Sequence, residues 1–207
     1  MTLTRILPSL RRSIPDPLDL DAWPELSHAT TTDVFVSGVS LLRVADLCGT
    51  PSVHTAAAVI PCSGGRPSST ERASVIVARV TSVMPAADGA LRVSLDARLA
   101  GLQLEFAQTR LIGRASTAKV AQIHLAGAGM RAGAGEEHTV SGTVTLPADI
   151  VVGDLLAIPC RRALAMLEVN PLPLEDGGGR TEIGHCAPEF TSAPSVALSE
   201  LWLTRLG

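Results

Sequence analysis

Aromatic residues and lysine are the scarcest components of this 207-residue chain. It has no tyrosine, three phenylalanines and two tryptophans, and Lys119 is its single lysine. Proteins that bind single-stranded nucleic acids stack bases on aromatic side chains, and duplex binders neutralise phosphates with a basic surface. The formal net charge is −3, and no stretch of the chain is strongly basic. We therefore expect no nucleic-acid partner.

Long apolar runs are also missing. No stretch of about 18 apolar residues is present, so the sequence predicts no membrane span and no membrane partner. The adjacent Arg11 and Arg12 are followed by Pro15, Asp16 and Pro17 rather than by an apolar segment, which argues against a secretory signal. We therefore expect a cytoplasmic protein.

Residues that usually bind metals or cofactors are dispersed along the chain. The four cysteines form no Cys-x-x-Cys pair, so we expect reduced thiols, with a Cys48–Cys62 disulfide as the alternative. The histidines form no His-x-His or His-x-x-x-His pair. No Gly-x-Ser-x-Gly motif or phosphate-binding glycine loop is present, and Lys119 is expected at a solvated strand end. The sequence therefore predicts no metal and no cofactor.

The residues that are abundant favour a β-rich core. Apolar residues make up 46% of the chain, and most of them are Ala, Val and Leu. The chain has about eight short alternating or β-branched segments separated by Gly, Pro or Asp-Gly signals. This pattern predicts a mainly β protein with a single Greek-key-type β-barrel, an N-terminal arm and two short helices.

The first 32 residues are predicted to form the arm, and residues 33–207 the barrel domain. Four prolines break any long helix in the arm, yet Ile6, Leu10, Ile14 and Trp23 are too apolar for a free tail. We expect the arm to lie against the domain or a partner subunit.

The expected elements follow from periodicity and turn residues. One helix is predicted at residues 41–48, between a Ser40 cap and Gly49. A second is predicted at residues 195–206, with an edge strand as the alternative there. Loops are predicted at 61–72, 127–135 and 175–180, and a hairpin turn at 88–89. Strands are predicted at residues 33–36, 52–60, 74–83, 91–95, 102–106, 111–112, 120–125, 139–146, 154–158 and 165–169.

Two segments carry a family resemblance. Residues 36–51 end in Gly49-Thr50-Pro51, and residues 74–159 end in Gly-Asp-Leu-Leu-Ala-Ile-Pro. Together they resemble pyridoxal-phosphate-dependent decarboxylases of the diaminopimelate and ornithine type. Those enzymes join a TIM barrel to a C-terminal β-barrel. The resemblance implies that this chain keeps the β-barrel and lacks the TIM barrel, whose place would be at about residues 52–70.

The chain differs from that family at the positions of the family's catalytic and cofactor-binding residues. The family pattern His-Cys-Glu-Ser-x-Asp resembles the run from His138 to Thr143, but Thr139, Val140 and Thr143 replace its reactive side chains. The family's cofactor lysine would lie in the missing TIM barrel, and its tyrosine has no counterpart here. The resemblance therefore implies that pyridoxal phosphate chemistry has been lost.

Our leading hypothesis is a stand-alone decarboxylase-like β-barrel that binds an apolar small molecule. If it is catalytic, the reaction would be a cofactor-independent cyclisation or isomerisation of secondary metabolism, in which the protein holds a reactive intermediate in shape. The catalytic candidates are His138, Thr139 and Ser141. Glu105 and His124 are candidate ligand-binding residues. His124 lies between Ile123 and Leu125, so by strand alternation it faces away from both.

Two further readings stay open. The chain could be a non-catalytic pseudoenzyme subunit that docks through its apolar arm onto a decarboxylase-type TIM-barrel partner, and a homodimer is also open. It could instead be a remnant with only a structural role. A roomy barrel interior would favour the ligand-binding hypothesis, and a packed interior with an exposed apolar surface would favour docking.

Overall fold

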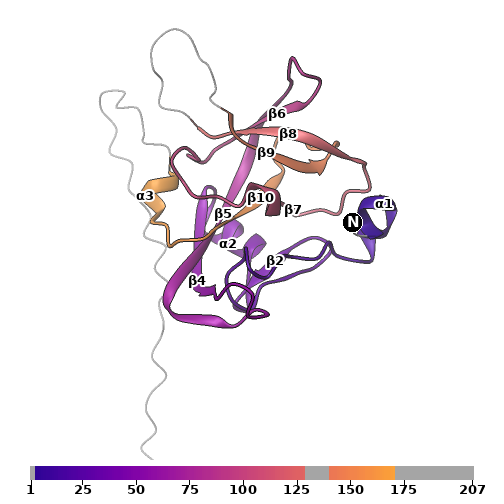
Figure 1. Ribbon diagram of the computed structural model, residues 1–207. Helices are drawn as coiled ribbons and strands as arrows, with labels where there is room; N and C mark the ends of the chain where they lie inside the picture. Colours follow the sequence, from indigo (N-terminus) through magenta and orange to yellow (C-terminus); the bar gives the residue numbers. More distant parts are fainter. Residues whose placement is uncertain (1–2, 129–139, 171–207) are drawn as a thin grey trace, which may run out of the picture. The chain divides into compact units, whose positions relative to one another are not determined.

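The chain folds as a nearly closed β-barrel sheet with short helices around it, as predicted (Figure 1). The computed structural model describes residues 3–128 and 140–170. The predicted segments at 175–180 and 195–206, and Cys186, lie outside the described residues. Within the described residues, no helix is long and apolar enough to span a membrane.

The organising element is β5 (Pro67–Pro85), a 19-residue strand. Its first part pairs with β4 (Ser52–Val59), and its last part pairs with β6 (Leu91–Leu95). Its middle pairs with β10 (Leu155–Cys160). Figure 1 shows β5 passing through the whole sheet, with β4 at one end and β6 at the other. The β-branched residues of β5 suit this position, because they pack well on a pleated surface buried on both faces.

The other strands complete the barrel. The order is β7 (Arg110–Ile112), β10, β5, β6, β8 (Val120–Ala126) and β9 (Val140–Pro147). Only the β6–β8 pair is parallel within this sheet. The 3-10 helix η2 (Phe106–Gln108) contacts both β9 and β10, so it lies near the opening where strand pairing does not close the barrel.

Side chains fill the barrel interior. Alternate residues of β5 point inward and meet aliphatic residues of β6, β8, β9 and β10. Gly142 of β9 makes room for the Phe106 ring, because a Cβ on Gly142 would lie only 2.4 Å from that ring. Burying each large aliphatic side chain contributes about 1.5–3 kcal/mol, so this interior is the main source of stability. Its fully buried members include Ile76, Val93, Ile123, Leu125, Leu156 and Ile158.

A second apolar layer covers the outer face of β5 and β10. Val75, Val77 and Ala157 meet Trp23 of the arm, which is 1% exposed. The layer is completed by α2 (Leu41–Cys48) and by the small sheet of β1 (His28–Ala29), β2 (Val34–Val36) and β3 (Val39–Ser40). The arm itself carries α1 (Leu3–Ile6) and the 3-10 helix η1 (Pro8–Arg12), and it lies against the domain.

The helix predicted at residues 41–48 is confirmed as α2. The Ser40 hydroxyl accepts a hydrogen bond from the Arg43 N–H at 3.0 Å, and Gly49 ends the helix with a φ of 76°. The hairpin turn predicted at residues 88–89 is confirmed between β5 and β6.

Three predicted elements are wrong. Residues 67–72 belong to β5, because pairing with β4 satisfies their backbone despite the Pro and Ser content. Residues 102–106 form no strand; Leu104 makes one isolated bridge to Cys160, and the chain then turns into η2. The strand predicted at residues 165–169 is the helix α3 (Met166–Val169), in which Glu168 accepts the Ala165 N–H at 2.8 Å.

Candidate functional site

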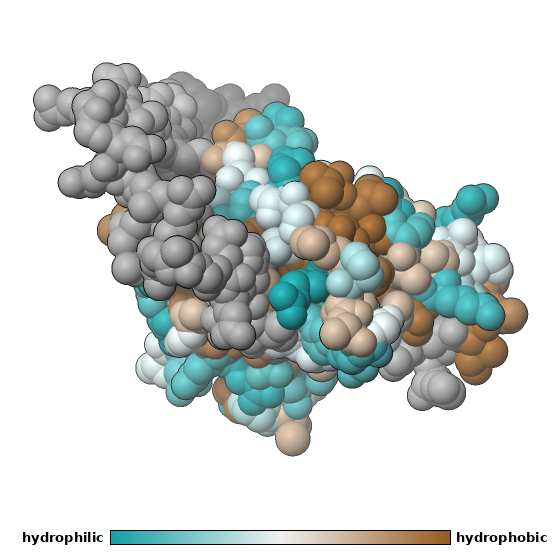
Figure 2. All heavy atoms as spheres, turned by 90° about the horizontal axis from the view of Figure 1, so that it is seen from above, coloured by the Kyte–Doolittle hydropathy of each residue, from teal (hydrophilic) through white to brown (hydrophobic). Residues whose placement is uncertain are grey.

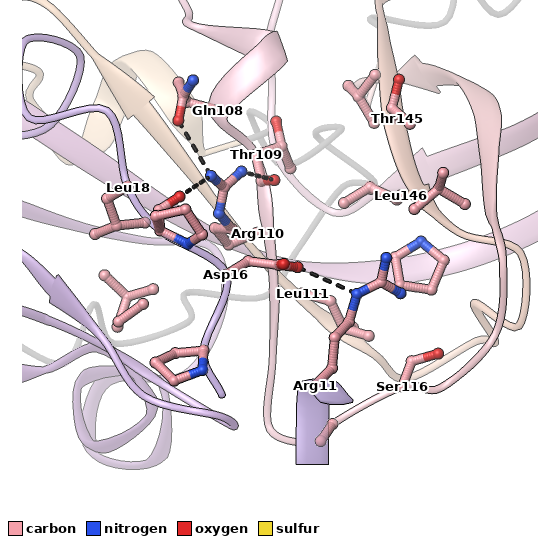
Figure 3. Close-up of a pocket in the computed structure, with 18 of the residues that line it drawn as sticks. Arg11, Asp16, Leu18, Gln108, Thr109, Arg110, Leu111, Ser116, Thr145 and Leu146 are labelled. Carbon is pink, nitrogen blue, oxygen red and sulfur yellow. Dashed lines mark hydrogen bonds and ion pairs between the residues drawn. The ribbon is translucent and has the colours of Figure 1, made fainter. Parts of the chain in front are cut away.

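A cleft of about 540 Å³ lies between the arm and the barrel. We call it the arm–barrel cleft. Its walls come from the arm around residues 11–19, the β1–β2 connection, the segment from η2 to residue 116, and β9. The arm is distant in sequence from the segment after η2 and from β9, and Figure 3 shows residues of all three around the cleft. The lining is mixed, because Leu18, Leu111 and Leu146 alternate with arginines, aspartates and hydroxyl groups.

Arg11 and Asp16 form an ion pair on the arm side of the cleft. The Arg11 Nε lies 3.3 Å from an Asp16 carboxylate oxygen, and the Arg11 side chain is 8% exposed. Arg11 also donates to the Ala118 carbonyl at 3.0 Å, which ties the arm to the barrel. Asp16 accepts a further hydrogen bond from the Thr4 hydroxyl. This pair therefore fixes the arm in place beside the cleft.

Arg110 belongs to the wall formed by the segment from η2 to residue 116, at the start of β7. Its guanidinium donates to the Pro17 carbonyl at 2.8 Å, the Thr109 carbonyl at 3.1 Å and the Gln108 amide oxygen at 3.2 Å. In Figure 3 the Asp16 carboxylate is directed at Arg11, while Arg110 turns toward Gln108 and the arm. Burial lowers the pKa of Arg110, and the nearby charge of Asp16 partly offsets this. Arg110 is thus a poorly hydrated cation with neutral partners.

Arg114 also lines the cleft, and two carboxylates neutralise its charge. It donates to both carboxylate oxygens of Asp154, at 2.8 and 2.7 Å, and to Asp149 at 3.2 Å. Ser116 holds Asp149 with a 2.6 Å hydrogen bond. The hydrogen bond with Asp154 is the main reason that the pKa of Arg114 is raised. This network braces the connection between β7 and β8.

A chain of three polar side chains crosses the outer face of β8 and β9. The His124 Nε2 lies 2.7 Å from an Asp88 carboxylate oxygen, and its Nδ1 lies 3.2 Å from the Thr143 hydroxyl. The hydrogen bond with His124 lowers the pKa of Asp88. When Asp88 accepts from Nε2–H, the neutral ring can accept the Thr143 proton at Nδ1. Because Thr143 lines the cleft, this chain can move a proton at its edge.

Of the five predicted site residues, the structure describes the side chains of Glu105 and His124. His138 and Thr139 lie outside the described residues, and for Ser141 only the backbone, in β9, is described. Glu105 does not line the cleft and instead pairs with Arg161. His124 faces outward, as alternation predicted, since Ile123 and Leu125 are both buried. Of these two described side chains, His124 reaches the cleft, through its contact with Thr143.

The sequence analysis did not identify the polar residues that line the cleft around Arg110: Arg11, Asp16, Gln108, Thr109 and Arg110 itself. One signal was available, since Arg110 directly precedes the apolar pair of β7 and so had to bury part of its side chain. Its contact with the Pro17 carbonyl spans 93 residues and has no signature in the sequence.

No protein-family model matches the chain, and a search of curated proteins finds no match either.

Proposed function

We propose that this chain is a β-barrel protein that binds a small molecule in the arm–barrel cleft. The observation that carries the proposal is the cleft itself, whose volume of about 540 Å³ is typical of ligand sites. Ligand sites usually combine apolar walls with a few converging polar groups. Leu18, Leu111 and Leu146 supply the apolar wall, and Arg110 and Thr109 supply polar groups.

The packed barrel interior counts against a ligand bound inside the barrel, so the proposed ligand site is the cleft outside it. The interior is filled by the aliphatic side chains of five strands and by Phe106. Because the interior is full, an apolar ligand would bind in the cleft, where its apolar part would contact the apolar wall.

Descent from the decarboxylase barrel remains part of the proposal. Its support is the barrel fold and the motif that ends in β10, in Leu-Leu-Ala-Ile-Pro. Any reaction would be a cyclisation or isomerisation that depends on holding the ligand in a reactive shape. The His124–Thr143 pair is the best-placed proton-transfer group for such a step, since it reaches the cleft edge.

Filling the cleft tests the proposal. Thr145 is an exposed strand residue that lines the cleft, and Thr81 is an exposed strand residue of β5 outside it. We expect T145W to abolish retention of small molecules, measured by native mass spectrometry of the full chain after incubation with a metabolite extract. The T81W variant should retain what the wild type retains. Identical retention by all three proteins would contradict the proposal.

A second candidate function is docking onto a decarboxylase-type TIM-barrel partner. The observation that favours it is the exposure of the first apolar residues of the arm: Leu3 is 66% exposed, Ile6 60% and Leu7 54%. On the face seen in Figure 2, apolar patches are interrupted by hydrophilic residues and form no single broad surface. Docking would therefore depend on the arm rather than on a wide apolar face.

The docking proposal has its own test. A complex with a decarboxylase-type TIM-barrel protein, detected by size-exclusion chromatography, should be lost when Leu3, Ile6 and Leu7 are replaced by serine. Val151 and Val152 are equally exposed apolar residues elsewhere, so their serine variants are the matched control. No complex with the wild type would rule this candidate out.

A further inference from the structure

The cleft holds one carboxylate between two guanidinium groups. Asp16 is ion-paired with Arg11 and is also bound by the Thr4 hydroxyl. Among the described residues, no carboxylate oxygen lies within 4.0 Å of an Arg110 nitrogen. Arg110 is therefore the guanidinium of this set that has no carboxylate partner within the described residues.

The other acidic residues of the cleft direct their hydrogen bonds away from Arg110. Asp33 accepts the N–H groups of Val34 and Leu42 and the Ser40 hydroxyl, so it is committed to the start of α2. Asp19 is directed at the Asp21 N–H in the arm. Arg110 is consequently left with carbonyl and amide oxygens alone, although a desolvated cation is stabilised far better by an anion.

Three buried donors at the cleft have no hydrogen-bond partner among the described residues: the Arg110 Nε, the Thr109 hydroxyl and the Arg11 Nε. The Arg11 Nε lies 3.3 Å from the Asp16 carboxylate, whereas the Arg110 Nε has no carboxylate within 4.0 Å. Thr109 is 2% exposed. An unpaired buried donor costs about 1–3 kcal/mol, which an incoming acceptor would recover.

Gln108 provides the group that an acceptor can displace. Its amide oxygen makes the longest of the three Arg110 hydrogen bonds, at 3.2 Å, and reaches the Asp19 N–H only at 3.4 Å. The amide is neutral, and both of its hydrogen bonds are long. A charged oxygen at the same position would bind Arg110 more strongly, because charge-assisted hydrogen bonds are about twice as strong as neutral ones.

We propose that the ligand of the arm–barrel cleft is an organic monocarboxylate, whose acid group replaces the Gln108 amide on Arg110 and whose apolar body lies along Leu18 and Leu111. This inference rests on the proposed function and specifies its ligand class. A monocarboxylate brings one negative charge to Arg110, whereas a phosphate monoester would bring nearly two into a cleft already lined by Asp16, Asp19 and Asp33. Thr109 donates its hydroxyl to the same acid group.

Three probes with one alkyl chain test the ligand class by isothermal titration of the full-length protein: hexanoate, the neutral hexanamide and the dianionic hexyl phosphate. We expect the wild type to bind hexanoate at least about 10-fold more tightly than either of the others. The R110Q variant should lose this preference. The exposed Arg43 of α2 lies outside the cleft, so R43Q should keep it.

If R110Q does not fold, the Q108A variant still tests the inference. Q108A removes only the competing amide and should tighten hexanoate binding several-fold. Unchanged or weaker binding by Q108A would overturn the inference.

The remaining outcomes separate the two proposals. Equal affinity of the wild type for hexanoate and hexanamide, both abolished by T145W, would overturn the carboxylate and leave the cleft as the binding site. A preference for hexyl phosphate would overturn the carboxylate in the same way. Binding of none of the probes would overturn this inference, and the proposed function would then be judged separately by the retention experiment with T145W and T81W.

Discussion

Arg110 and Arg114 lie four residues apart and line the same cleft, yet their surroundings differ. Arg114 is held by two carboxylates through charge-assisted hydrogen bonds. Arg110 is held by three neutral oxygens. The first arrangement is complete within the protein and stabilises the fold. The second lacks a counter-ion within the described residues. We therefore regard Arg110 as a candidate binding residue and Arg114 as a structural one.

The largest effect should come from breaking the Arg114 network. Asp154 is 8% exposed and accepts three hydrogen bonds, two from Arg114 and one from the Val151 N–H. We expect D154A to lower the free energy of unfolding by about 2–3 kcal/mol, the low end for a broken ion pair because Arg114 stays partly hydrated. Urea unfolding measures this, with the exposed Asp46 of α2 as D46A control. Equal stability of both variants would mean that the network is not structural.

Acidification should weaken the apolar layer beneath α2. His54 is half-buried in β4, and burial lowers its pKa, although a hydrogen bond to the Val36 backbone partly offsets this. Above pH 6.5 the ring is neutral in both states; below it, the unfolded chain takes up a proton that the folded chain resists. The free energy of unfolding should therefore fall as the pH drops from 6.5 through the lowered pKa of folded His54.

The pH effect is measured by urea unfolding between about pH 5 and 8. The H54Q variant should lose most of this decrease in the free energy of unfolding. The H28Q variant, at an exposed histidine, is the control and should show the same decrease as the wild type. A wild-type stability that is flat across this range would show that His54 is not the titrating group.

Removing the charge of Arg110 should cost little stability. Methionine has a similar length. The substitution removes the desolvation cost of a cation that lacks a counter-ion, and it also removes the hydrogen bonds of that cation, so the two effects on the free energy of unfolding nearly cancel. We expect R110M to change the free energy of unfolding by less than about 1 kcal/mol in either direction. R114M, which leaves Asp154 unpaired, should be clearly less stable in the same assay. If R110M were the less stable of the two, the contrast between these arginines would be lost.

The smallest effect belongs to the chain of Asp88, His124 and Thr143. Asp88 lies in the exposed hairpin turn, where water screens its attraction to His124. We expect D88N to leave the midpoint of urea unfolding unchanged. A shift as large as that of D154A would mean that this chain supports the fold rather than proton transfer at the cleft edge.

The sequence predicts the barrel well because its signals are local. Alternation located β6 and β8, and Ser40 with Gly49 located α2. The segment at 165–169 was misjudged because Glu168 caps its own turn, a side-chain contact that an apolar pattern does not reveal. The cleft was not predictable, since it requires the arm to return to η2 and β7 through contacts such as Arg110 with Pro17.

The most direct test of the account compares the two arginines in one experiment. Arginine Nε–H groups give separate signals in a ¹⁵N-resolved NMR spectrum, and R110Q and R114Q assign those of Arg110 and Arg114. On addition of hexanoate, the Arg110 signal should shift and saturate, while the Arg114 signal stays in place. An Arg110 signal that does not move, or equal movement of both signals, would contradict the claim that the cleft binds a carboxylate at Arg110.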